Sequence, residues 1–275
     1  MDPTARSSQG DPVPRGLLAG AGARLRLSLA RLGSVAWLGG ESLSALLSLR
    51  GGAWGVFWQT FRNQVRFTAL DALPLAAVTA LLLGGVALFQ ALGELSGLGL
   101  EAQLSQLMAL LVVRELGPVL VAILVVGRSG TAIAAEMASM KLDGEVDTLW
   151  ATGVDPVAYL LAPRLAAGVV SLLVLVVLFD AVALVGGFVV ASLRFPLSLR
   201  LYLSALEVAV GGAEVAGTFL KAASFGLTIP LVACHSGLRL SGSSTEIPQV
   251  VTRATVESML AIFVLSAIVS VACYA

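Results

Sequence analysis

The residues of this chain best suited to polar chemistry lie between Arg114 and Arg164, beginning with Arg114-Glu115-Leu116-Gly117-Pro118 inside an apolar run. A charged side chain at the centre of a membrane helix costs about 2.5–3.5 kcal/mol on insertion scales. Neighbouring helical residues point about 100° apart, so we expect Arg114 and Glu115 each to need its own partner or water. Pro118 removes one helical hydrogen bond and favours a kink after the pair.

The same stretch continues as Gly127-Arg128-Ser129-Gly130-Thr131-Ala132-Ile133-Ala134-Ala135-Glu136-Met137. Its small residues allow close approach of helices. No Gly-Lys-Ser/Thr follows, so this is no phosphate-binding loop, and the pattern is no Gly-x-Ser-x-Gly nucleophile elbow. His235 is the single histidine, and Cys234 and Cys273 fall in different apolar segments. We therefore expect no catalytic residue, metal site, disulfide framework or cofactor.

Acidic residues gather among apolar ones farther along, and they are Glu136, Asp143, Glu145, Asp147 and Asp155. This pattern predicts a short amphipathic helix over about 136–149. A helix of this kind suits contact with the surface of a partner protein.

Composition identifies the elements that must position these residues. Hydrophobic residues make up 57% of the chain and charged residues 12%, with a mean hydropathy of +0.94; a soluble domain has about 25% charged residues. The apolar blocks are continuous, which favours membrane helices over barrel strands that alternate apolar and polar residues. The zero net charge gives no support for nucleic-acid binding. The fold class predicted is an all-α membrane protein.

We predict five transmembrane helices, at about 68–92, 104–127, 157–191, 208–234 and 255–274, the third being longer than one crossing requires. Residues 1–15 form a polar tail that we expect to be disordered, and residues 16–275 form a single membrane domain. Within it, residues 16–66 mix arginines with leucines and aromatic residues. That mixture is typical of an amphipathic helix in the headgroup layer.

Basic residues predict the orientation. The N-terminal segment to Arg66 carries eight arginines, and the segments 128–164 and 235–253 carry three and two basic residues. The opposite side has none over 93–103 and two over 192–204. By the positive-inside rule the N-terminus is cytoplasmic, and five crossings place the C-terminus outside.

The stretch from Arg114 to Arg164, closing with Gly153-Val154-Asp155-Pro156 and Pro163-Arg164, closely resembles the MlaE permease family. These are membrane subunits of bacterial phospholipid-trafficking ABC systems. The resemblance covers about fifty residues without a gap. It implies a homodimer in the bacterial inner membrane that works with a separate cytoplasmic ABC ATPase and a periplasmic MCE-domain protein and carries phospholipid. The acidic helix around residues 136–149 would be its coupling helix.

The resemblance also implies roles for particular residues. Gln90, Glu115 and Leu116 match positions that face a lipid cavity between the protomers, Arg114 lies beside them, and Lys221 matches a basic position in the fourth span. The residues expected to couple to the ATPase are Glu136, Met140, Asp147, Gly153 and Asp155. Two features depart from the family: Ser266 aligns where relatives often carry an acid, and the tail before Gly16 has no counterpart.

Other interpretations stay open from the sequence alone. Glu115 is also explained as a structural ion pair tying spans together. Lys221, which shares a helical face with Glu214, is explained in the same way by a structural pairing between spans. Asp71, Glu115, Asp180 and Glu214 could instead serve an ion- or proton-coupled secondary transporter. An intramembrane enzyme is disfavoured, because only His235 could act as a histidine base.

Overall fold

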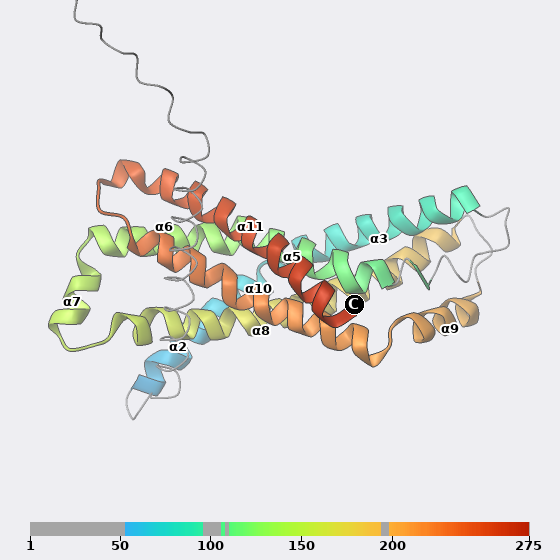
Figure 1. Cartoon of the computed structure of the whole chain (residues 1–275), viewed down its shortest axis with the longest axis horizontal. Coiled ribbons are helices and arrows are strands. Elements are labelled where there is room, and N and C mark those ends of the chain that lie inside the picture. The colour runs from blue at the N-terminus through green and yellow to red at the C-terminus, as the bar shows by residue number, and fades with distance from the viewer. Residues whose placement is uncertain (1–52, 96–105, 108–109, 194–197, 275) are drawn as a thin grey trace, which may run out of the picture.

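The computed structural model describes residues 53–95, 106–107, 110–193 and 198–274 (Figure 1). The predicted tail 1–15 and most of the predicted interfacial segment 16–66 lie outside these residues. All regular structure in the described part of the chain is helical. Five helices are long and apolar enough to cross a membrane: Phe57–Gln90, Val112–Leu142, Tyr159–Val190, Gly212–Leu238 and Ser244–Cys273. The predicted all-α membrane fold with five spans is confirmed.

The first three spans are built from several helical pieces. The first contains α2 (Ala53–Val65), a π-helical turn (Arg66–Leu70) and α3 (Leu73–Leu95). The second contains a π-helical turn (Val112–Leu116), α5 (Gly117–Val125), another π-helical turn (Val126–Gly130) and α6 (Thr131–Leu142). The third begins with a π-helical turn (Val157–Leu161) and continues as α8 (Ala162–Ser192). Single π turns inside α-helices occur frequently at functional sites.

The remaining elements are α7 (Glu145–Ala151), α9 (Leu199–Ala209), α10 (Gly212–Leu238), a short 3₁₀ turn (Ser244–Glu246) and α11 (Ile247–Tyr274). In Figure 1, α7 lies at one end of the bundle, while α9 lies at the other end, where α3 also ends. We call these the α7 end and the α9 end.

The predicted helix over 136–149 is two helices. Residues 136–142 belong to α6, which continues the second span, and α7 starts only at Glu145. Gly144 separates them with a left-handed φ of 75°. The second span also runs beyond its predicted end at residue 127, because the helical backbone continues where the apolar composition stops.

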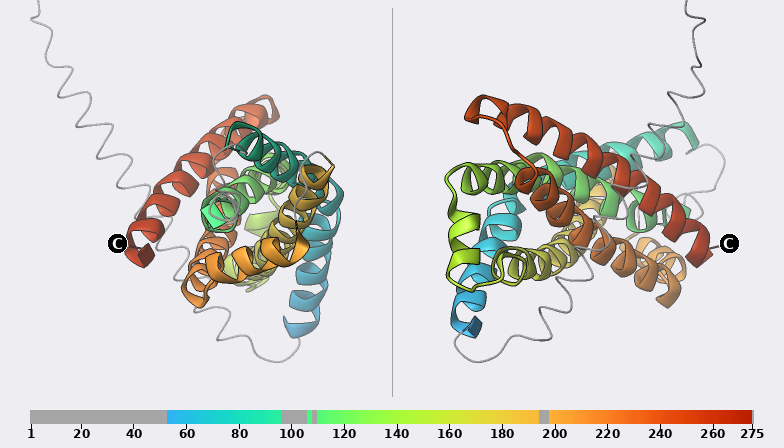
Figure 2. Two further views of the ribbon diagram at one scale, coloured as in Figure 1. Left: turned by 90° about the vertical axis from the view of Figure 1, so that its right-hand side faces the viewer. Right: turned by 60° about the vertical axis from the view of Figure 1, so that its left-hand side comes forward.

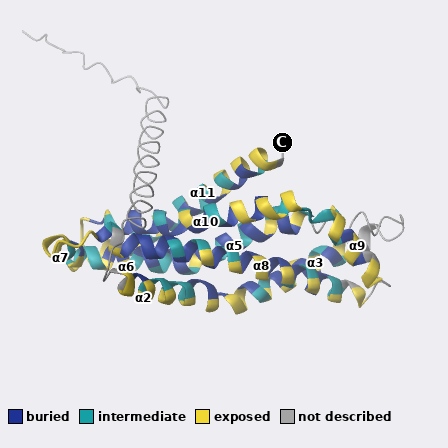
Figure 3. Ribbon diagram, turned by 90° about the horizontal axis from the view of Figure 1, so that it is seen from below, coloured by how far each residue is buried: buried dark blue, intermediate teal, exposed yellow. Residues whose placement is uncertain are grey.

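Close contacts between helix backbones hold the bundle together, with α8 packed against α3 and α10 (Figure 2). A Cβ added to Gly84 of α3 would overlap the backbone of Ala183 in α8, and one on Gly226 of α10 would lie 2.6 Å from the Cα of Val169 in α8. Small residues at such crossings allow the close packing typical of membrane helices. Figure 3 shows buried residues facing the interior and exposed residues, many of them apolar, facing outward.

Helix α9 is fixed to the third span by Tyr202. Its hydroxyl donates a hydrogen bond to the carbonyl oxygen of Leu184 at 2.9 Å, and its ring packs against Phe188. Burial raises the pKa of Tyr202 to about 12, so the hydroxyl keeps the proton that it donates.

Candidate functional site

The structure brings Glu115 and Lys221 together with two serines of the last span. Lys221 Nζ lies 2.9 Å from Glu115 Oε2, and Ser270 Oγ donates to Glu115 Oε1 at 2.8 Å. Ser266 Oγ lies 3.5 Å from Glu115 Oε2. We call these four residues and Arg114 the central cluster. It connects the second, fourth and fifth spans. Glu115 therefore forms an ion pair between spans, as one of the sequence interpretations described.

The backbone around Glu115 explains why the partners come from α10. In the π turn the amide of Gly117 donates to Val112 O, which leaves the Val113 carbonyl without its α-helical donor. Thr218 Oγ1 of α10 donates to this carbonyl at 2.9 Å. Pro118 has no N–H, so the Arg114 carbonyl also loses its α-helical donor. Lys221 Nζ donates to the Arg114 carbonyl at 2.7 Å. Two side chains one turn apart on α10 thus donate hydrogen bonds to two carbonyls that have no backbone donor within the second span.

Arg114 and Glu115 were expected to need separate partners, and this expectation is wrong in part. Arg114 Nε lies 3.6 Å from Glu115 Oε1, so the neighbours also pair with each other. The long arginine side chain spans the angle between two adjacent positions, and the wider π turn changes the directions in which they point.

Exposure differs sharply across the central cluster. The Lys221 side chain is fully buried, whereas the side chains of Glu115 and Arg114 are 34% and 29% exposed. The next residue, Leu116, is also exposed. The cluster therefore presents a carboxylate and a guanidinium on its outer side while Lys221 holds the carboxylate from within. Such a surface can contact a polar group.

Gln90 does not join this cluster. It is exposed near the end of α3, and none of the hydrogen bonds found among the described residues connects it with Glu115 or Lys221.

A basic side chain satisfies the carbonyl that is left free in another π turn. In the turn Arg66–Leu70 the amide of Asp71 donates to Arg66 O, which frees the Phe67 carbonyl. Arg128, in the π turn of the second span, donates to this carbonyl at 2.6 Å and lies 3.3 Å from Asp71 Oδ2. Its guanidinium also lies over the Phe67 ring, 4.8 Å from the centroid. The Gly-Arg-Ser-Gly motif thus joins the first and second spans.

The carboxylates considered for secondary transport have separate environments. Asp71 pairs with Arg128 and Glu115 with Lys221. Asp180 is buried on α8 against Gly117, and its Oδ1 has no hydrogen-bond partner within the described part of the chain. Across the described ranges, no three acidic, histidine or cysteine side chains are arranged to hold a metal ion.

The residues expected to couple to an ATPase lie at the α7 end, where two of them, Asp147 and Asp155, stabilise the local structure. Asp147 Oδ1 is 2.9 Å from Lys141 Nζ, and Asp155 Oδ1 accepts a hydrogen bond from the amide of Val157 at 2.9 Å. Gly153 has a left-handed φ of 76°, which favours glycine at this turn. Trp150, which the sequence argument did not select, is 63% exposed on α7.

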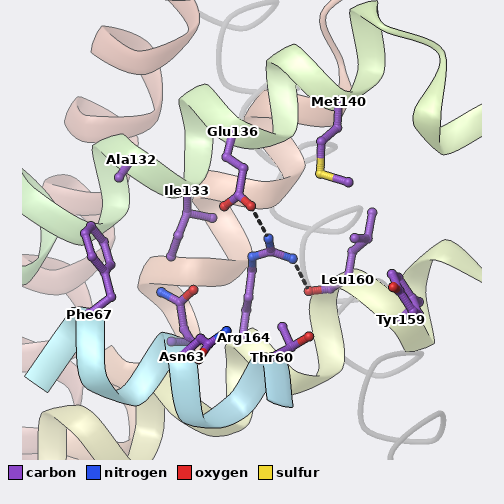
Figure 4. Close-up of a pocket in the computed structure, with 11 residues that line it drawn as sticks. Thr60, Asn63, Phe67, Ala132, Ile133, Glu136, Met140, Tyr159, Leu160 and Arg164 are labelled. Carbon is purple, nitrogen blue, oxygen red and sulfur yellow. Dashed lines mark hydrogen bonds and ion pairs between the residues drawn. The ribbon is translucent and has the colours of Figure 1, made fainter. Parts of the chain in front are cut away.

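Glu136 and Met140 face a different direction from α7. Glu136 Oε1 accepts a hydrogen bond from Arg164 at 2.8 Å, and both Glu136 and Met140 line a cavity between α2, α6 and the start of α8 (Figure 4).

Sequence reasoning missed Thr218 and Ser270 as partners of the second span. Ser270 follows Ser266 by four residues, a spacing that places both on one helix face, and this signal could have found it. Thr218 had no such signal, because its role depends on a carbonyl freed by a π turn that the sequence does not reveal.

Comparison with known proteins gives a consistent result. The family model described as Permease MlaE matches residues 61–272. A probable ABC transporter permease protein of Rickettsia typhi is 31% identical over 202 residues, covering 74% of this chain and 78% of the relative. The intermembrane phospholipid transport system permease protein MlaE of Haemophilus influenzae is 32% identical over 211 residues, covering 75% and 81%. The protein TRIGALACTOSYLDIACYLGLYCEROL 1, chloroplastic, of Arabidopsis thaliana is 27% identical, covering 78% and 61%.

Proposed function

The chain belongs to the MlaE permease family of ABC transporters, and from this premise we propose that it moves phospholipid between the inner membrane and the outer envelope of a bacterium. In this proposal the chain is a homodimeric conduit with its N-terminus in the cytoplasm. A separate ATPase binds the α7 end and an MCE-domain protein binds at the α9 end.

The observation that carries the proposal is the exposed surface of α7 and the turn after it. This surface combines the acidic residues Glu145, Asp147 and Asp155 with the exposed apolar residues Trp150 and Val154. α7 lies at the very end of the bundle (Figure 1), where it is accessible to a soluble protein. An exposed tryptophan surrounded by charged residues is typical of an energetic centre in a protein–protein interface.

The central cluster supports the lipid part of the proposal. Glu115 and Arg114 offer opposite charges at a partly exposed position within a membrane span, so they can contact the charged groups of a phospholipid headgroup. Gln90 and Leu116 remain expectations as further lining residues. Ser266 and Ser270 contact Glu115 from the fifth span. Relatives often carry an acid at the position of Ser266, so the carboxylate at this site comes from the second span alone.

Co-purification tests the ATPase contact. Trp150→Ala removes the exposed anchor without touching a hydrogen bond of the described structure, and we expect the amount of bound ATPase to fall at least tenfold. Leu203→Ala on α9 is the matched control, because Leu203 is exposed to a similar degree at the opposite end of the bundle. Equal ATPase retention by wild type and Trp150→Ala would contradict the proposed docking surface.

Reconstitution tests the transport mode. Proteoliposomes that contain the chain and its ATPase should move labelled phospholipid only when ATP is supplied. Movement driven by a proton gradient with no ATPase present would instead support the secondary transporter.

A further inference from the structure

A cavity of about 440 Å³ lies between α2, α6 and the start of α8, separate from the central cluster (Figure 4). α2 contributes Thr60, Asn63 and Gln64, and the π turn that follows it contributes Phe67; these positions recur at the spacing of one helix face. The opposite wall contains Glu136 from α6 and Arg164 from α8. The π turn Val157–Leu161 lies just before Arg164, and the Leu160 carbonyl in this turn accepts a hydrogen bond from the guanidinium. The cavity therefore combines polar amides and a hydroxyl with an ion pair on a partly apolar wall.

Arg164 is the buried member of this wall. Its side chain is 6% exposed, and it donates to Glu136 Oε1 and to the Leu160 carbonyl, each at 2.8 Å. Its Nε is buried and has no hydrogen-bond partner among the residues that the structure describes. A buried guanidinium N–H without a partner costs free energy, so an acceptor from a ligand in the cavity would stabilise it. Glu136, by contrast, is 53% exposed.

The residues beside the cavity indicate its depth in the bilayer. Trp54 and Trp58 of α2 are exposed, and so are Arg62 and Arg66 on the same membrane helix. Exposed tryptophans and arginines mark the level of the lipid headgroups. The cavity thus lies near the headgroup layer on the side of the α7 end.

We infer that this cavity binds the headgroup of a zwitterionic phospholipid with a primary amine, phosphatidylethanolamine, from the leaflet on the α7 side. The phosphate accepts the free N–H of Arg164, since guanidinium groups are well suited to phosphate oxygens. The ammonium group lies against Glu136, whose second carboxylate oxygen is not used by Arg164. Phe67 and Ile133 offer apolar contact for the glycerol end of the lipid.

Charge balance favours this headgroup over an anionic one. The cavity wall carries one positive and one negative side chain, Arg164 and Glu136, so a neutral headgroup with separated charges matches it. A headgroup with a phosphate alone would leave its net negative charge facing Glu136. Phosphatidylcholine matches in charge, but its quaternary ammonium cannot donate a hydrogen bond to the carboxylate.

Lipid retention tests the inference with a variant that fills the cavity and leaves the ion pair intact. The full-length protein is reconstituted in nanodiscs with equal amounts of phosphatidylethanolamine, phosphatidylglycerol and phosphatidylcholine, and retained lipids are counted by native mass spectrometry after detergent extraction. We expect wild type to retain at least fivefold more phosphatidylethanolamine than either of the other two lipids. Thr60→Phe should reduce retention to the bulk ratio. Gln59→Phe adds the same ring at the exposed neighbouring position, outside the cavity, and should behave as wild type.

Two outcomes overturn the inference. One is an unchanged preference in Thr60→Phe, which would place the retained lipid elsewhere on the protein. The other is full displacement of the lipid by soluble phosphoethanolamine or inorganic phosphate, which would assign the cavity to a soluble phosphate compound. ATP-driven transport measured on the same variants is a separate readout, so a failure here leaves the proposed transport function standing.

Discussion

Lys221 Nζ donates to the Arg114 carbonyl at 2.7 Å, and this carbonyl is the one that Pro118 leaves without an α-helical donor. The same ammonium group lies 2.9 Å from Glu115 Oε2. One buried lysine therefore satisfies both the backbone and the side chain of the second span, which makes it a sensitive position for stability.

Lys221→Met should destabilise the protein, because it leaves the Glu115 carboxylate without its buried partner. Breaking a fully buried pair costs about 3–5 kcal/mol, and the partial exposure of Glu115 places the expected loss below that range. Thermal unfolding in detergent measures the effect. Adding Glu115→Gln should restore part of the loss. Lys141→Met is the control, since it breaks an exposed pair worth about 0–1 kcal/mol; a loss as large as that of Lys221→Met would contradict the argument.

Thr218→Val should cost about 1–3 kcal/mol, because it leaves the buried Val113 carbonyl without a donor. Thr228→Val removes a hydroxyl from the same helix, but Thr228 donates to the Ser224 carbonyl one turn back within the helix. Chemical or thermal unfolding should therefore show a clearly smaller loss for Thr228→Val. Equal losses would mean that the π turn does not make the Val113 carbonyl dependent on Thr218.

Gly84→Ala should destabilise by about 1–3 kcal/mol or more, because the added methyl group would overlap the backbone of Ala183 and force α3 and α8 apart. Gly212→Ala adds the same methyl group where no atom lies within 4 Å. The yield of monodisperse protein and its unfolding temperature provide the comparison. A Gly84→Ala variant as stable as Gly212→Ala would show that the two helices separate at little cost.

Asp180→Asn should fold at least as stably as wild type and keep ATP-driven lipid transport. The side chain is buried, and an amide avoids the desolvation of a charged group. Asp71→Asn serves for comparison, because it weakens the contact with Arg128 and should lose a little stability. Transport that is abolished in Asp180→Asn while the fold is intact would favour the ion-coupled alternative.

Composition and motif order were enough to predict the membrane fold, the five spans and the family. The continuous apolar blocks dictate helices, since lipid offers no partner for backbone groups. The position of Lys221 opposite Glu115 could not be predicted in the same way, because helical spacing shows which residues share a face of one helix but not which helices face each other. The break at Gly144 was missed because the acidic pattern continues across it, while the backbone turns there with positive φ.

The π turns were invisible for a related reason. Two of them free a carbonyl that a side chain from another helix satisfies: Arg128 donates to the Phe67 carbonyl, and Thr218 donates to the Val113 carbonyl. The sequence of one helix alone does not show which side chains of other helices will contact it, so these turns could not be predicted.

The π turn Val126–Gly130 affects how the accessibility of single labelled positions along the second span must be interpreted. One additional residue in a helical turn rotates everything beyond it by about 100° relative to an uninterrupted α-helix. Accessibility of single cysteines introduced along α5 and α6 should therefore repeat every 3.6 residues on each side of the turn, with a phase jump between the two series. Labels assigned from one continuous helical wheel would place the residues of α6 on the wrong face.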